Sequence, residues 1–257
     1  MAEGKKNNFL VKIQSIRRRS YASSIFLKPD DIIVAVNNQF YTFGEKKLTE
    51  ELKDIKKNEA KVILTVLRSN TFFDIVINNS LGCKYSSTTE IETQNIREKF
   101  SSKENFDIEE LQEFTVLRDA FRRYDIIDTS TSIIAGLFPP LWLIYSQKWW
   151  VLATLVALSA ILLVVNPLLF LFGWLLMSLY CYKAQLNLMY SFSMLEGKVF
   201  CMNISSKTID HAQRIIREID PKSRFQYSKL PDPVSEDVGQ ESEKKQDIVD
   251  EKKEALV

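Results

Sequence analysis

The sequence predicts an α+β protein in which a small β-rich domain with one main helix is linked to an α-helical membrane hairpin and a short αβ C-terminal element. Three observations carry this prediction. The first eighty residues contain short β-branched runs and one amphipathic helical pattern. The 34 residues 149–182 contain no charged side chain. A strand-like run and a second amphipathic helix follow within residues 198–220.

Composition narrows the functional classes. The chain has 257 residues, with 34 Lys and Arg against 33 Asp and Glu, so its net charge is +1. Nucleic-acid binders normally concentrate an excess of basic residues, and this balance argues against that class. The cysteines at 83, 181 and 201 are far apart and include no Cys-x-x-Cys pair. This spacing suits neither a disulfide framework nor a zinc site.

The β-rich domain is expected over residues 1–80. Residues 9–16, 31–36, 61–67 and 72–77 have the alternating or β-branched character of strands. Between them, Leu48, Leu52 and Ile55 fall at i, i+4 and i+7, which predicts an amphipathic helix over 45–57.

Two segments of this domain carry a resemblance. Ser20-Tyr21-Ala22 followed by residues 27–38 (LKPDDIIVAVNN) is similar to the bacterial PDZ pattern S-P-A-x-x-A-G-L-x-x-G-D-x-I-x-x-V-N-G. The resemblance covers about residues 9–78. Asp30 and Asn38 stand where that pattern has glycine, and they are the non-glycine types that best tolerate positive φ. Phe26 replaces a third glycine, and Tyr21 replaces proline.

A PDZ-like fold implies binding of a peptide C-terminus by strand addition. The groove would then be lined by a strand edge and the helix, which gives the candidate peptide-binding residues Phe9, Leu10, Val11, Lys47, Leu48 and Glu51. No Gly-Leu-Gly-Phe-like segment precedes the first strand. A degenerate module used for other protein contacts, or as a structural unit, therefore stays open.

Residues 81–106 are rich in Ser, Thr, Asn and charge, and we expect a linker. Residues 107–147 are expected to form a juxtamembrane amphipathic helix followed by an interfacial segment. The helix would begin after Asp107, and its apolar stripe would be Ile108, Leu111, Phe114, Leu117 and Phe121. Its basic end would meet anionic lipid or, alternatively, the stripe would pack on protein.

The membrane segment is expected at residues 148–183. One helix through 149–182 would be about 51 Å long, against a hydrocarbon core of roughly 30 Å. Asn166-Pro167 divides it into 149–165 and 168–182, which favours a helical hairpin over a single kinked and tilted span. Neither half contains Asp, Glu, Lys, Arg or His, so anchoring is favoured over a pump or proton-coupled transporter.

The placement of basic residues favours two spans. With two spans, the lysines and arginines that flank the hairpin share one face, as the positive-inside rule requires. A third span through 133–145 stays open, although Pro139-Pro140 interrupts that segment. The candidate membrane-interface residues are Arg118, Arg122, Arg123, Trp142, Lys148, Trp149, Trp150 and Lys183. We expect an integral protein of the bacterial inner membrane with both termini cytoplasmic.

Residues 184–230 are expected to form the αβ element, with a strand at 198–204 and a helix at 206–220, followed by a disordered acidic tail at 231–257. A second resemblance covers about 114–219, which is similar to an uncharacterised family of small bacterial membrane proteins. It implies topology and origin, and it implies no activity.

No enzyme motif is present in the sequence. His211 is the only histidine, and a His-Glu-x-x-His zinc motif needs two. We expect His211 to be a solvated surface residue. There is no Gly-x-Ser-x-Gly elbow and no phosphate-binding glycine loop. We therefore expect a non-enzyme without cofactor or metal, namely a membrane-anchored interaction module with a protein or peptide partner. The alternative is a structural or transport-accessory subunit, and homo-oligomerisation is left open.

Overall fold

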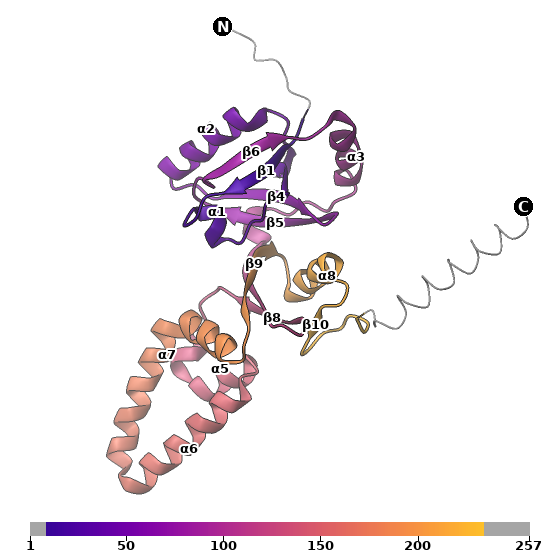
Figure 1. The fold of residues 1–257 in the computed structure, drawn as a ribbon. Helices are drawn as coiled ribbons and strands as arrows, with labels where there is room; N and C mark the ends of the chain where they lie inside the picture. The colour runs from indigo at the N-terminus through magenta and orange to yellow at the C-terminus, as the bar shows by residue number, and fades with distance from the viewer. Residues whose placement is uncertain (1–8, 234–257) are drawn as a thin grey trace, which may run out of the picture.

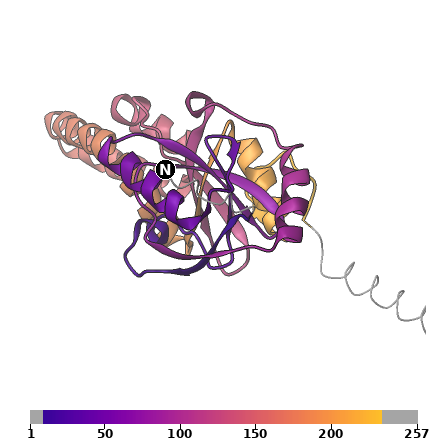
Figure 2. The same ribbon diagram turned by 90° about the horizontal axis from the view of Figure 1, so that it is seen from above.

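The computed structural model of the chain describes residues 9–233. It is a mixed α/β structure whose large sheet forms one end and whose long helices form the other (Figure 1). Seen from above in Figure 2, the long helices project to one side of the sheet. Of the predicted acidic tail, residues 234–257 lie outside the described part.

Ten strands and eight α-helices form the described chain, together with one short 3-10 turn at Ile108–Glu110. The strands are β1 Val11–Ile16, β2 Ile32–Val36, β3 Gln39–Phe40, β4 Val62–Arg68, β5 Thr71–Ile77, β6 Cys83–Ser87, β7 Gln112–Arg118, β8 Arg123–Asp128, β9 Val199–Ser206 and β10 Arg224–Phe225. The helices are α1 Tyr21–Ser24, α2 Gly44–Lys57, α3 Glu90–Phe100, α4 Ile134–Leu137, α5 Pro139–Tyr145, α6 Trp149–Val165, α7 Pro167–Leu195 and α8 Ile209–Ile219.

All ten strands belong to one sheet, in the order β10-β8-β7-β9-β5-β4-β2-β1-β6, with β3 paired to β2. Its first half comes from residues 11–87 and its second half from the strands that flank the long helices. The two halves meet where β9 pairs with β5, and this contact has a single register pair, Asp74 opposite Ser205. Side chains of α2 and α8 pack into one core with one face of the sheet, whereas Ile96 and Phe100 of α3 pack on the opposite face.

The four predicted strands and the helix of the N-terminal domain are confirmed as β1, β2, β4, β5 and α2. The strand and helix predicted at 198–204 and 206–220 are likewise confirmed as β9 and α8. The linker predicted at 81–106 is wrong, because this stretch forms β6 and α3. The Thr89 side chain caps α3 by accepting from the Glu92 amide.

The helix predicted after Asp107 is also wrong. Beyond the short 3-10 turn, this segment is β7, which pairs with β8 on one side and β9 on the other. Phe114 and Val116 belong to the main core, and Thr115 and Leu117 on the opposite face are buried as well. In a strand that is buried on both faces, apolar residues do not alternate with polar ones. The spacing of the apolar residues can then resemble the stripe of an amphipathic helix.

Left-handed backbone occurs at all three positions where the PDZ pattern has glycine and this chain does not. The φ angles are 58° at Phe26, 72° at Asp30 and 62° at Asn38. Asp and Asn adopt this region at modest cost, whereas Phe26 is strained there, by about 1–2 kcal/mol. Its ring is stacked on Phe200 with centroids 5.7 Å apart, a contact that holds the strained residue in place.

The helical end contains α4 to α7. Helix α6 has the predicted bounds, and α7 begins at Pro167 but continues to Leu195, thirteen residues beyond the predicted end at 182. The Asn166 side chain caps α7 by accepting from the Leu168 amide at 2.8 Å. Large apolar side chains of α6 and α7 are exposed along their length, among them Val156, Ile161, Val164, Leu168, Leu171, Phe172 and Leu175. Within the described chain, α7 alone is long and apolar enough to cross a membrane, and α6 is a shorter apolar helix.

A buried ionic cluster joins these helices to the sheet. The Lys148 ammonium lies 2.9 Å from an Asp125 oxygen and 3.1 Å from a Glu196 oxygen, and only 4% of its side chain is exposed. Lys198 bridges the same two carboxylates at 3.2 and 2.8 Å. The Ser193 hydroxyl donates to Asp125 at 2.6 Å. The cluster therefore fixes the start of α6 and the end of α7 to β8.

Candidate functional site

The open edge of the sheet lies at β6. Strand β1 is paired with β2 on one side and with β6 on the other, whereas β6 ends the strand order in the described chain. Helix α2 lies next to β6 in Figure 1. An unpaired strand edge beside a helix is a template for strand addition.

Two adjoining cavities, of about 600 and 520 Å³, follow the space between β6 and α2. They share Thr49 and Lys53 of α2 and Cys83, Lys84 and Tyr85 of β6, so we treat them as one β6–α2 groove. One end of the groove reaches the turn at residues 80–82 and the end of β1 at Ile16 and Arg17.

The turn before β6 contains a glycine in the left-handed region of backbone conformation. Gly82 has φ +70°, and a Cβ added there would lie 3.0 Å from the Ser20 Cβ, so the position requires glycine. The Leu81 carbonyl accepts from the Ala22 amide at 3.0 Å, which fixes the turn to α1. Within residues 9–233, the Leu81 and Gly82 amides donate no hydrogen bond, and they are therefore free to bind an acceptor in the groove.

Basic side chains dominate the end of the groove near this turn. Arg17, Lys53 and Lys84 line the cavity that the turn closes, and no carboxylate does. The acidic side chains Glu45 and Glu50 line only the other cavity. A carboxylate at the Gly82 end would therefore find free amides and a positive potential.

Burial makes Cys83 and Tyr85 poor acids. Burial, with a small contribution from Asp31, raises the pKa of the Cys83 thiol to about 11. Burial also raises the pKa of Tyr85 well above its ordinary value of 10.0. Both groups are neutral at physiological pH, and both pack against the main core.

The structure places the predicted peptide-binding residues differently. Leu10 is fully buried against the α3 side, Val11 is buried in the main core, and Phe9 immediately precedes them. Because both edges of β1 are paired, this segment offers no edge for a peptide. Leu48 lies on the inner face of α2 and is completely buried. The remaining two, Lys47 and Glu51, lie one turn apart on α2 at 3.9 Å, outside the groove lining.

Sequence reasoning missed the groove residues 80–85 because the strand edge comes after the domain rather than before it. The signal that could have found them is Leu81-Gly82 directly before Cys83–Ser87 (CKYSS), a glycine followed by a short run with strand character.

The predicted membrane-interface residues fall into two groups. Trp142 and Lys148 are buried, the former in the small core that α4 to α7 share. Trp149, Trp150 and Lys183 are exposed.

The three predicted interface arginines lie on the β7–β8 hairpin rather than on a helix. Arg122 pairs with Asp220 at 2.8 Å and Arg123 pairs with Asp119. Contact of Arg118, Arg122 or Arg123 with lipid stays a prediction.

His211 is not a solvated residue. It is half-buried, its Nδ1 lies 2.8 Å from the Ser206 hydroxyl, and its ring meets Phe106 edge-on. Burial, followed by the positive charge of Arg214, lowers its pKa below 6.5. No group of three or more His, Cys, Asp or Glu side chains that could hold a metal ion occurs within residues 9–233.

No known family model matches the chain, and no curated protein is significantly similar to it. The site is therefore interpreted from its own geometry.

Proposed function

We propose that this chain is a membrane-anchored interaction module that binds the carboxyl terminus of a protein partner in the β6–α2 groove. The observation that carries the proposal is the free edge of β6, which ends at a glycine turn with two unbonded amides. A peptide would add as a further strand along β6, and its terminal carboxylate would accept from the Leu81 and Gly82 amides. Arg17 and Lys53 would strengthen that contact.

The PDZ resemblance supports the same reading. The three glycine positions of the pattern keep positive φ in this chain, as described above. In a PDZ-like module the groove strand follows the carboxylate loop, and residues 80–87 would supply both in that order. The module would thus be built from residues 9–87, with its groove strand at the end of the segment.

The apolar helices support the anchoring half of the proposal. Helix α6 is 17 residues, or about 25 Å, and the uncharged part of α7 is of similar length, so a two-span hairpin fits a thin hydrocarbon core. Helix α5 has seven residues, about 11 Å, which is too short to cross. The sheet and the groove would then lie in one compartment, with the bacterial inner membrane and a cytoplasmic face as the expected setting.

Peptide binding to the full chain in detergent micelles tests the first half. Fluorescence anisotropy would compare labelled peptides that end in a free carboxylate with the same peptides amidated at that end. We expect binding only with the free carboxylate and at least about a tenfold loss in Thr49→Tyr, which fills the groove. The matched control, Lys56→Tyr on the same helix outside the groove lining, should bind normally. Equal binding of both peptide forms, or of neither, would remove the proposal.

Protease accessibility in oriented vesicles tests the anchor. Sites introduced near residues 60 and 230 should be cut from the same side of the membrane, and a site placed at 166 should be cut from the other side. The accessory-subunit alternative gains support if crosslinks at α6 and α7 capture the same partner protein in wild type and in Thr49→Tyr.

A further inference from the structure

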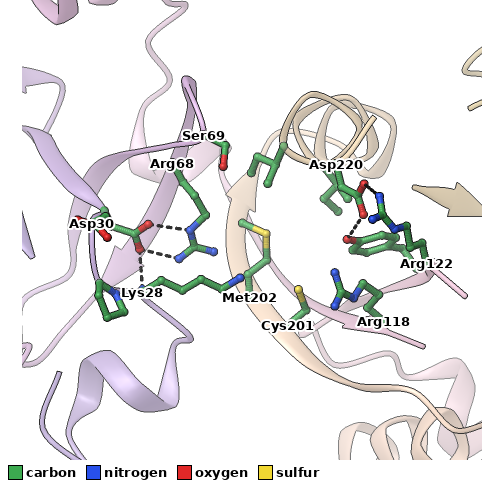
Figure 3. Close-up of a pocket in the computed structure, with 14 residues that line it drawn as sticks. Lys28, Asp30, Arg68, Ser69, Arg118, Arg122, Cys201, Met202 and Asp220 are labelled. Carbon is green, nitrogen blue, oxygen red and sulfur yellow. Dashed lines mark hydrogen bonds and ion pairs between the residues drawn. The ribbon is translucent and has the colours of Figure 1, made fainter. Parts of the chain in front are cut away.

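A separate cavity of about 390 Å³ lies where the two halves of the sheet meet. Residues 28–31 and 68–69 line it from the first half, and residues of β7, β8, β9 and α8 line it from the second. Figure 3 shows the extended Lys28 side chain reaching toward Met202, and Arg118 pointing into the same space from the opposite side. It shares no lining residue with the β6–α2 groove.

The charges around this cavity do not cancel. Each of the three carboxylates in its lining already has a cationic partner: Asp30 pairs with Lys12 at 2.9 Å, Asp31 with Arg68 at 2.6 Å, and Asp220 with Arg122 at 2.8 Å. Asp220 also accepts from the Tyr124 hydroxyl at 2.9 Å. Lys28 and Arg118 are the remaining cations of the lining, and within residues 9–233 neither forms an ion pair with a carboxylate. Arg118 is hydrogen-bonded to the Tyr124 side chain, through which it lies near Asp220. Two cations without an ion-pair partner in the described chain therefore face one cavity from two separate elements.

We propose that this cavity binds a phosphate ester, with its oxyanion between Lys28 and Arg118. A guanidinium donates to two phosphate oxygens at once, and a lysine ammonium complements it as a point charge. The cavity exceeds the volume of a lone phosphate, and Met202, Ile216 and Ile219 give it an apolar wall for the substituent. A soluble phosphate ester and the headgroup of an anionic lipid present the same chemistry here.

The position of the cavity gives binding a structural consequence. The strands of the two halves share only one β5–β9 register pair, beside the core and the Phe26–Phe200 contact that also connect the halves, and the two cations come from opposite sides of that junction. A bound oxyanion would therefore tie the halves together. Because a ligand that binds the native state stabilises it by mass action, binding should raise the unfolding temperature of the full chain.

Thermal unfolding and calorimetry of the full chain in detergent test the site with inorganic phosphate and glycerol phosphate, each against sodium chloride at equal ionic strength. We expect a concentration-dependent rise in unfolding temperature. Lys28→Gln and Arg118→Gln should each weaken binding about tenfold, since each removes a charge-assisted contact. Lys57→Gln, which removes an exposed lysine distant from the lining, should bind as wild type does, and Arg118→Lys should retain part of the affinity.

A second arm identifies the source of the phosphate. The same variants would be measured in nanodiscs of phosphatidylcholine with and without phosphatidylglycerol. A shift that needs phosphatidylglycerol and is lost in Lys28→Gln supports the site with a lipid headgroup as ligand, whereas a shift with glycerol phosphate alone supports it with a soluble ester. No shift beyond chloride in either arm, or an equal loss in Lys57→Gln, overturns the proposal. None of these results bears on the proposed peptide binding, because the cavity and the groove share no lining residue.

Discussion

Replacing Asp125 with asparagine should destabilise the native protein by about 3 kcal/mol. The Asp125 carboxylate accepts from Ser193 at 2.6 Å and faces the ammonium groups of Lys148 and Lys198 at 2.9 and 3.2 Å. The amide removes the negative charge and leaves both lysines with Glu196 alone. Breaking a buried ion pair by neutralising one partner costs roughly 3–5 kcal/mol. The Asp125 side chain is 24% exposed, which places the expected loss at the lower end of that range.

Equilibrium unfolding of the full chain in detergent, followed by tryptophan fluorescence, measures this loss. Trp150 reports on the cluster directly, because its indole donates to Glu196 at 3.2 Å. The matched control is Asp128→Asn on the same strand, whose exposed side chain accepts only from Ser130 within the described chain, and a change within about 0.5 kcal/mol is expected there.

A double-mutant cycle separates the ion pair from other effects of the amide. Lys148→Met removes the ammonium that faces Asp125, so the double variant should lose less than the sum of the two single losses, by at least about 1 kcal/mol. Additive losses, or a loss below about 0.5 kcal/mol for Asp125→Asn alone, would refute the reasoning that this cluster holds the helices to the sheet.

Three further outcomes are expected. Burial alone would raise the pKa of Asp125, but the charges of Lys148 and Lys198 outweigh burial and hold this pKa below 3.8. The stability that Asp125 contributes is therefore complete above its pKa in the unfolded chain. In pH titrations of unfolding, this contribution should fall below about pH 4. Gly136→Ala should cost about 1–3 kcal/mol in the same unfolding assay, because the new Cβ would lie 2.9 Å from the Tyr182 Cβ. Cys83 should react slowly with maleimide at pH 7 and faster toward pH 10, in mass-spectrometric labelling, because burial raises its pKa to about 11.

Sequence patterns could predict two kinds of segment: those that bury one face only, and short runs in which every side chain is apolar. Strands β2 and β4 are β-branched runs flanked by turn residues, and α6 is bounded by Lys148 and by Asn166-Pro167. Such local signals give the element and its limits without knowledge of its neighbours.

The errors arose where distant segments decide the structure. Strand β7 is covered on both sides by β8 and β9, and β9 lies more than eighty residues away, so its neighbours cannot be read from its own pattern. Strand β6 has little apolar character, and it is a strand because β1 supplies its partner edge. The β6–α2 cavities were missed for the same reason, because β6 follows the predicted domain in the chain but adjoins β1 in space.

A continuous sheet gives the groove a defined relation to the long helices. The β6–α2 groove lies at one end of the strand order, and β8, to which the Lys148 cluster fixes α6 and α7, lies near the other end. Between them, β4 and β5 pair along their full lengths, whereas β5 and β9 share one register pair. A change in the angle between the groove and the helices would therefore have to alter the β5–β9 contact and the core that α2 and α8 share. The Ser205 hydroxyl, which accepts from the Val76 amide at 2.9 Å, is a second bond across this junction, and the Lys28–Arg118 cavity is lined by Cys201 and Met202 of the same strand β9. An oxyanion bound there would restrict that angle, which couples the occupancy of the cavity to the orientation of the groove above the helices.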